Sequence, residues 1–149
     1  MLGLRQGSAR MHDLSLRPAT VGDSAFALEI TEACMRVYVE QTWGSWNGLA
    51  DFDSACDQIV ELAGKPIGLM GVERSNDHWF IDKLYLMPAF QNRGIGNVLL
   101  NQLKDEAKQA RKKLRLSVLE VNPVGRFYQR HGFAVTHTVP PRVYMEWTP

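Results

Sequence analysis

Between Trp79 and Ala110 the sequence predicts a strand, a glycine-containing loop and a long helix in direct succession. Trp79–Met87 is the expected strand, and Pro88 ends it. Apolar side chains then recur at helical spacing and form one stripe, made up of Ile95, Val98, Leu99, Leu103, Ala107 and Ala110. Gly94 and Gly96 lie where this helix begins. Glycine allows unusual backbone dihedrals, so these two residues favour a tight turn between the strand and the helix.

This turn is a potential anion site built from backbone groups. The first N–H groups of a helix have no partner within the helix, and the helix dipole adds positive potential at that end. Arg93 would add a cation and Asn97 a polar side chain on the rim. A dinucleotide fingerprint would need a third glycine where Leu99 stands, and a P-loop would need Gly-Lys-Ser/Thr. Taken alone, the glycine pair fits a plain strand–helix turn equally well.

The rest of the chain alternates between helical and strand patterns. A capping box at Thr20–Asp23 opens a predicted amphipathic helix that reaches about residue 40. A second short helix is expected around residues 51–57, and a third from Asn122-Pro123 to Gly132. The predicted strands are 14–18, 59–62, 67–73, 79–87, 114–119, 133–138 and 142–147. This order describes one mixed α/β domain.

Composition narrows the class of protein. A chain of 149 residues suits one domain, here expected over 12–149 behind a flexible tail of residues 1–11 without a signal sequence. The chain has 17 basic and 16 acidic residues, so its formal net charge is only +1. A charge this small creates no strong electrostatic attraction to nucleic acid or to an anionic membrane. No apolar run is long enough to span a bilayer. We therefore expect a cytoplasmic protein that binds neither nucleic acid nor membrane, as a monomer or a homodimer.

Two segments resemble motifs of the GNAT acyl-CoA N-acyltransferase superfamily. LYLMPAFQNRGIGNVLL (84–100) is similar to its central motif, and NPVGRFYQRHGF (122–133) is similar to the next one, apart from Gly125, where the family usually has alanine. Their order and separation match, and the resemblance covers 12–149. It implies an α/β (α+β) fold with a mixed, mostly antiparallel sheet flanked by helices. The two central parallel strands of this sheet should splay apart.

The resemblance also implies acetyl-CoA as acyl donor and no metal. Backbone groups near Leu84 and Leu86 should pair with the pantetheine arm, and N–H groups of 91–97 should hold the pyrophosphate. Asn122 should bond the arm, and Tyr128 should stand beside the sulfur. The implied cofactor-binding residues are Leu84, Leu86, Gln91, Asn92, Arg93, Gly94, Ile95, Gly96, Asn97, Asn122 and Tyr128.

N-acylation needs a base for the amine, whose pKa is about 10.4, and an acid for the thiolate. Tyr128 is the candidate acid, and the alternative is a tyrosine that only packs. Strand alternation would place Phe80, Asp82, Leu84 and Leu86 on one face, with Asp82 as a base acting directly or through water. Asp82 could equally be a hydrogen-bonded structural carboxylate. Glu73 is a second candidate base, and in some family members water alone suffices.

The acceptor side is less constrained. Tyr38, Trp43 and Trp46 cluster in MRVYVEQTWGSWN (35–47), where they form either an aromatic wall for the acceptor or a packed loop. The four histidines do not pair with carboxylates at metal-ligand spacing. We expect acetyl transfer to a small-molecule or peptide amine. A non-catalytic acyl-CoA-binding regulatory module is the alternative, and an unrelated nucleotide-binding protein is a third possibility.

Overall fold

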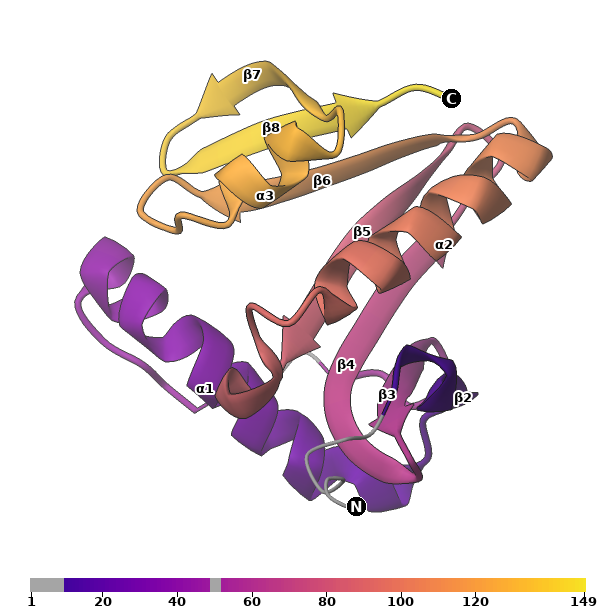
Figure 1. Cartoon of the computed structure of the whole chain (residues 1–149). Coiled ribbons are helices and arrows are strands. Elements are labelled where there is room, and N and C mark those ends of the chain that lie inside the picture. Colours follow the sequence, from indigo (N-terminus) through magenta and orange to yellow (C-terminus); the bar gives the residue numbers. More distant parts are fainter. Residues whose placement is uncertain (1–9, 49–51) are drawn as a thin grey trace.

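The computed structural model describes residues 10–48 and 52–149 (Figure 1). Its strands are β2 (Leu14–Pro18), β3 (Asp57–Leu62), β4 (Lys65–Arg74), β5 (His78–Leu86), β6 (Lys113–Leu119), β7 (Ala134–Val139) and β8 (Arg142–Trp147). The α-helices are α1 (Ser24–Trp43), α2 (Ile95–Ala110) and α3 (Gly125–Arg130), and 3₁₀ turns span Met11–Asp13, Val21–Asp23 and Pro88–Phe90. The expected mixed α/β architecture is confirmed.

The strands form one seven-stranded sheet in the order β2-β3-β4-β5-β6-β8-β7. Every neighbouring pair within the described residues is antiparallel except β5 and β6, which are parallel. The mostly antiparallel sheet is therefore as predicted. The parallel pair needs a crossover, and α2 supplies it between the end of β5 and the start of β6.

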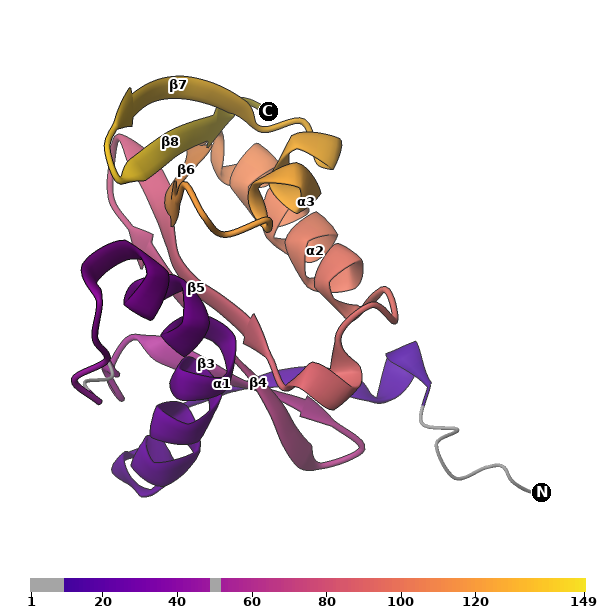
Figure 2. The same ribbon diagram turned by 90° about the vertical axis from the view of Figure 1, so that its left-hand side faces the viewer.

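The two parallel strands diverge after a short paired stretch. Their register covers only His78–Phe80 on β5 and Lys113–Arg115 on β6, although β5 continues to Leu86 and β6 to Leu119. Figure 2 shows the C-terminal part of β5 running away from β6. The predicted splay is confirmed, and it leaves one edge of each strand without a neighbouring strand in the middle of the sheet.

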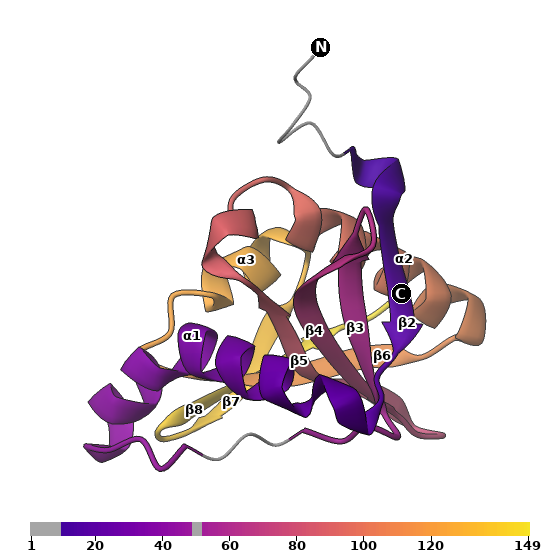
Figure 3. The same ribbon diagram turned by 90° about the horizontal axis from the view of Figure 1, so that it is seen from below.

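Helices cover both faces of the sheet (Figures 2 and 3). The apolar stripe of α2 packs against strand residues of one face, in a core that includes Ile95, Leu99, Leu103, Leu114, Leu116 and Met145. On the opposite face α1 packs through Ala27 and Ile30 against Ile59 and Leu69. The predicted stripe from Ile95 to Ala107 is thus the buried face of α2, whereas Ala110 at its end is exposed.

Helix α1 begins and ends much as the sequence indicates. The Thr20 N–H donates to the Asp23 carboxylate at 2.8 Å, which forms the predicted capping box one 3₁₀ turn before the helix. The helix runs slightly past residue 40 and ends at Trp43, because Gly44 adopts a left-handed conformation with φ of 85°.

Two helix predictions are wrong in detail. The short helix expected around 51–57 is a turn followed by the start of β3; residue 51 itself lies outside the described residues. The Asp53 carboxylate accepts the Ala55 N–H at 2.9 Å, and the Asp57 carboxylate accepts the Asp53 N–H at 3.0 Å, so side chains fold this segment as a turn. Helix α3 begins at Gly125, two residues after Pro123, because Asn122 makes a turn first.

Candidate active site

The N-terminus of α2 presents backbone amides that lie outside the hydrogen-bond ladder of the helix. Gly94, at the N-cap, has a φ of 83°, and Asn92 has a φ of 61°. The Val98 N–H donates to the Gly94 carbonyl at 3.1 Å, so the amides of residues 95–97 precede the helical hydrogen-bond ladder. Together with the helix dipole they form a positive pole beside the open end of the splay. This geometry fits an anionic group such as a pyrophosphate.

Gln91 differs from the other residues of the predicted pyrophosphate loop. Its backbone N–H donates to the Pro88 carbonyl at 3.2 Å, so this amide is already engaged. Its side-chain amide donates to the Leu86 carbonyl at 2.9 Å, and the Cys34 thiol donates to the same oxygen at 3.2 Å. Gln91 therefore ties the loop to the end of β5 and to α1.

The two sequence motifs meet where α2 passes α3 (Figure 2). A Cβ atom at Gly96 would lie 3.3 Å from the ring of Phe127, which is tighter than most real contacts. Asn97 Oδ1 lies 2.7 Å from His131 Nε2, so its side chain is bonded to the end of α3. Glycine at position 96 thus permits close helix packing, and Asn97 holds the two motifs together.

The edge of β5 that faces the splay carries the backbone groups predicted to meet the pantetheine arm. The Met87 N–H donates to Ile67 of β4 at 2.8 Å, so by alternation the amides of Leu84 and Leu86 point away from β4 and toward β6. The carbonyl of Leu86 is already the acceptor for Cys34 and Gln91. The two N–H groups, and not this carbonyl, are what the strand offers to a ligand in the splay.

Tyr128 is buried in the core beside α2. Its ring makes edge contacts with Phe127 and Phe133, with centroids 5.1 Å and 5.4 Å away. It is only 6% exposed, and this burial raises the pKa of its hydroxyl above the usual value of 10. The phenol is therefore protonated at neutral pH, as a proton donor must be.

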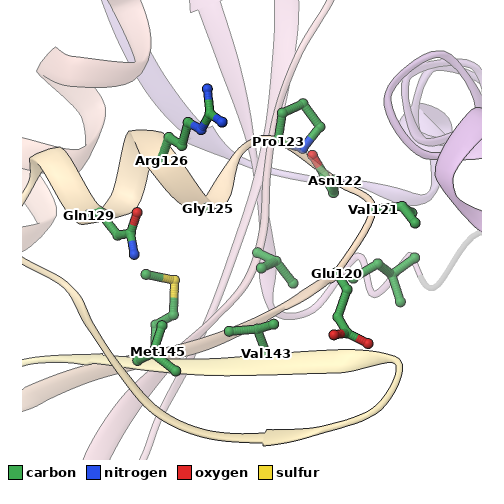
Figure 4. Close-up of a pocket in the computed structure, with 12 residues that line it drawn as sticks. Glu120, Val121, Asn122, Pro123, Gly125, Arg126, Gln129, Val143 and Met145 are labelled. Carbon is green, nitrogen blue, oxygen red and sulfur yellow. The ribbon is translucent and has the colours of Figure 1, made fainter.

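Asn122 occupies the turn between β6 and α3. Its Oδ1 accepts the Val124 N–H at 3.0 Å, which leaves the side-chain NH₂ group able to donate. Figure 4 shows Asn122 at the rim of a hollow of about 360 Å³, also lined by Glu120, Arg126 and Met145. Its first role is thus to form the turn before α3.

The predicted orientation of Asp82 is wrong because β5 is bulged. In the register with β4, Ile81 pairs with Val72 and Lys83 with Gly71, so Asp82 is the extra residue of the bulge. Ile81 and Leu84 consequently belong to the same core, which strict alternation forbids. The Asp82 side chain is 46% exposed and lies 3.6 Å from the ammonium of Lys83, not between apolar neighbours.

The comparison with known families decides the identity of the fold. A family described as Acetyltransferase (GNAT) domain matches residues 55–135, more than half of the chain. The chain belongs to this family. It is therefore an acyltransferase, and the resemblance seen in its two sequence motifs is confirmed.

Solved structures share the fold of this GNAT domain at low sequence identity. The PaiA N-acetyltransferase from Thermoplasma acidophilum, in complex with coenzyme A, has a TM-score of 0.72 and 17% identity, covering 91% of this chain and 99% of that chain. An acetyltransferase from Thermus thermophilus has a TM-score of 0.73 and 16% identity, with coverage of 91% and 97%. Naa50 from Arabidopsis thaliana has a TM-score of 0.65 and 18% identity, with coverage of 90% and 97%. No curated protein matches the sequence.

The residues predicted for the acceptor side lie away from the α2 loop, at the end of α1. Trp43 is 53% exposed, and the guanidinium of Arg142 lies 5.8 Å from its ring, so the end of α1 meets the start of β8. Figure 3 shows the β7–β8 hairpin beside this end of the helix. Tyr38 is half-buried, and the buried Trp46 Nε1 has no hydrogen-bond partner among the described residues. Trp43 thus contacts β8 of this GNAT domain, whereas the indole N–H of Trp46 makes no hydrogen bond to the described residues.

Sequence reasoning missed a buried ion pair behind the bulge. Lys83 Nζ lies 2.7 Å from Asp57 Oδ2, and the two side chains are 5% and 2% exposed. A Cβ at Gly71 would lie 2.6 Å from the Asp57 carboxylate, so glycine lets this carboxylate approach β4. A lysine inside a predicted strand was the available signal, since lysine is rarely buried without a partner.

Neither a membrane span nor a metal centre is seen in residues 10–48 and 52–149. No helix there has the length and apolar character to cross a bilayer. The same residues contain no group of three His, Cys, Asp or Glu side chains arranged to hold a metal ion.

Proposed function

We propose that this GNAT enzyme transfers an acetyl group from acetyl-CoA to a primary amine by direct attack while both substrates are bound. The observation that carries the proposal is the position of the α2 N-terminus beside the open end of the β5–β6 splay. The amides of the α2 turn suit a pyrophosphate, and the Leu84 and Leu86 amides suit an extended amide-containing arm. The pyrophosphate-binding residues in this proposal are Asn92, Arg93, Gly94, Ile95, Gly96 and Asn97.

Two structural neighbours support both substrates. The Thermoplasma acidophilum enzyme is in complex with coenzyme A, and Arabidopsis Naa50 is in complex with the bisubstrate analogue CoA-Ac-MVNAL. The second ligand joins coenzyme A to a peptide through an acetyl group, as expected when donor and acceptor are bound together. These ligands support an amine acceptor as the second substrate of this site.

The proposed reaction exchanges one acyl bond for another. The amine nitrogen forms a bond to the thioester carbonyl carbon, and the carbon–sulfur bond breaks. One backbone N–H near Leu84–Leu86 donates to the carbonyl oxygen as its negative charge develops, and the other pairs with the arm. Asn122 donates to the arm through its side-chain NH₂ group. Tyr128 gives its proton to the departing thiolate, and Asp82 receives the proton that the amine loses.

The setting of Asp82 favours a water relay. Its carboxylate is partly exposed and lies 3.6 Å from the Lys83 ammonium, within reach of solvent water. Because the bulge turns this short side chain toward solvent, a water molecule spans the distance to the amine more readily than the carboxylate does. Glu73 is exposed on β4 and remains the weaker candidate.

Thiol release and thermal stability test the proposal together. Acetyl-CoA should raise the melting temperature, whereas ATP and NAD should not. Adding a panel of amines and peptides should release free coenzyme A thiol with at least one acceptor. Stabilisation without thiol release from any acceptor would favour a regulatory acyl-CoA-binding module, and stabilisation by ATP or NAD instead would refute the acyl-CoA assignment.

A further inference from the structure

A second hollow lies on the sheet face opposite α2. It encloses about 520 Å³ and lies over the N-terminal part of β5 together with β6, β7 and β8. Leu114 and Leu116 of β6 point into the core beside α2, so Arg115 points to the other face. By the same alternation, Met145 points toward α2, while Tyr144 and Glu146 line the hollow.

Aromatic side chains form two sides of this hollow, here called the ring pocket. On one side, His137 of β7 and Tyr144 of β8 are register partners, and their rings stack with centroids 4.5 Å apart and planes 3° from parallel. On the other side lies Phe80 of β5. Strands β5 and β8 are separated by β6, and Phe80 is in line with Arg115 and Glu146, whereas Tyr144 lies two residues further along β8, so these sides are about 12 Å apart. A ring midway between them would have its centroid about 6 Å from each, within the roughly 4.5–7 Å of edge-to-face aromatic pairs.

The charge within the ring pocket is balanced. Arg115 Nε donates to Glu146 at 2.7 Å, and Arg115 Nη1 lies 3.4 Å from His78 Nδ1. This contact with Arg115 holds the pKa of Glu146 below its usual value, so the pair stays ionised at neutral pH. The guanidinium offers a planar cation on which an aromatic ring stacks, while Glu146, which also lies 3.6 Å from Lys113 Nζ, offsets part of its charge. The pocket therefore suits an aromatic ring better than an anionic group.

The ring pocket adjoins the point where the splay begins. Phe80 and Arg115 are the last paired residues of β5 and β6, and both line the pocket. Asp82 follows two residues beyond Phe80, about 7 Å along the strand. A ring held beside Phe80 would thus place an amine on a short alkyl linker near Asp82, at the closed end of the splay.

We propose that the ring pocket binds the aromatic group of the acceptor, so that primary amines on an arylalkyl chain are the preferred substrates. This inference rests on the proposed function, because it assumes that the acetyl group lies in the splay. The amine enters from the sheet face opposite α2, and its ring lies on the Arg115 guanidinium with its edges toward Phe80 and the His137–Tyr144 pair.

Matched acceptors and variants test this inference. Thiol release from acetyl-CoA is measured with 2-phenylethylamine and tryptamine, and with n-hexylamine as the acceptor without a ring. We expect kcat/KM to be at least about 10-fold higher for the aryl amines than for n-hexylamine, since the contacts of the acceptor ring with Phe80 and with Tyr144 both contribute to binding. Phe80→Leu should lower kcat/KM for the aryl amines roughly 3- to 10-fold and lower it for n-hexylamine by less. Phe80→Tyr, which keeps the ring, should retain the preference.

The controls separate this inference from the proposed function. Val139→Thr changes an exposed residue of β7 outside the pocket lining and should leave the kinetics with all three acceptors unchanged. If Phe80→Leu fails to fold by thermal melting, Tyr144→Leu takes its place. Equal use of hexylamine and phenylethylamine, or equal losses for both in the variant, would overturn the ring pocket while acetyl transfer stands. No thiol release with any amine would overturn both.

Discussion

Lys83 and Asp57 form an ion pair inside the protein, with Nζ 2.7 Å from Oδ2 and both side chains at least 95% buried. They come from β5 and β3, on either side of β4, and they lie next to the bulge at Asp82. The pair therefore joins β3 to β5 across β4, at the bulge where the side chains of β5 switch faces of the sheet.

Removing one partner of this pair should destabilise the fold strongly. Lys83→Met leaves the Asp57 carboxylate buried without its cation, and we expect the free energy of unfolding in urea to fall by about 3–5 kcal/mol. The double variant Lys83→Met with Asp57→Leu removes both charges and should recover most of that loss. A single variant as stable as the wild type would show that the pair is not a buried charge pair in solution.

Gly94 should matter for acetyl-CoA binding beyond its effect on stability. Its φ of 83° strains any other residue, so Gly94→Ala should cost about 1 kcal/mol and tilt the first amides of α2. Gly64 provides the control, because it has a φ of 81° in the β3–β4 turn with nothing within 4 Å of an added Cβ. We expect both variants to lose similar stability, but only Gly94→Ala to raise KM for acetyl-CoA several-fold.

Gln91 should act by positioning the loop. Gln91→Ala removes the 2.9 Å bond to the Leu86 carbonyl, so the loop is held less firmly against β5. We expect KM for acetyl-CoA to rise about 3- to 10-fold, as for the loss of one neutral hydrogen bond, with kcat little changed. Gln109→Ala, on the exposed side of α2, is the matched control. An unchanged KM for Gln91→Ala would remove this residue from the site.

Tyr128 should be needed for turnover and not for cofactor binding. Tyr128→Phe keeps the buried ring and its contacts with Phe127 and Phe133 but removes the proton donor. We expect kcat to fall by about 10²- to 10⁴-fold while acetyl-CoA still raises the melting temperature. Full turnover in this variant would assign Tyr128 to packing alone.

His131 should make the native state sensitive to mild acid. Burial, followed by the nearby Lys104 and Arg130, lowers the pKa of His131 in the folded protein below its usual value of 6.5. The unfolded chain therefore binds this proton more readily, and folding stability should decline as pH falls through 6.5 toward the lower folded pKa. His131→Asn should flatten this part of the stability curve. Parallel curves for variant and wild type between pH 7 and 5 would contradict the assignment.

Much of the fold follows from local sequence patterns. The stripe from Ile95 to Ala110 predicted α2 and, as far as Ala107, its buried face, and Gly94 marked where that helix begins. These predictions succeeded because helical periodicity and turn chemistry depend on residues close together in the chain. The helix expected around 51–57 failed because the Asp53 and Asp57 carboxylates bond the backbone locally in a turn.

By itself, the sequence determined most of the elements, the order of those elements and, through two motifs, the family. Only the tertiary structure decided the bulge that turns Asp82 to solvent, the ion pair of Lys83 with Asp57, and the grouping of Phe80 with His137 and Tyr144. The physical reason is that a bulge is a property of register between two strands. Contacts between side chains far apart in the chain likewise depend on how the whole sheet is assembled.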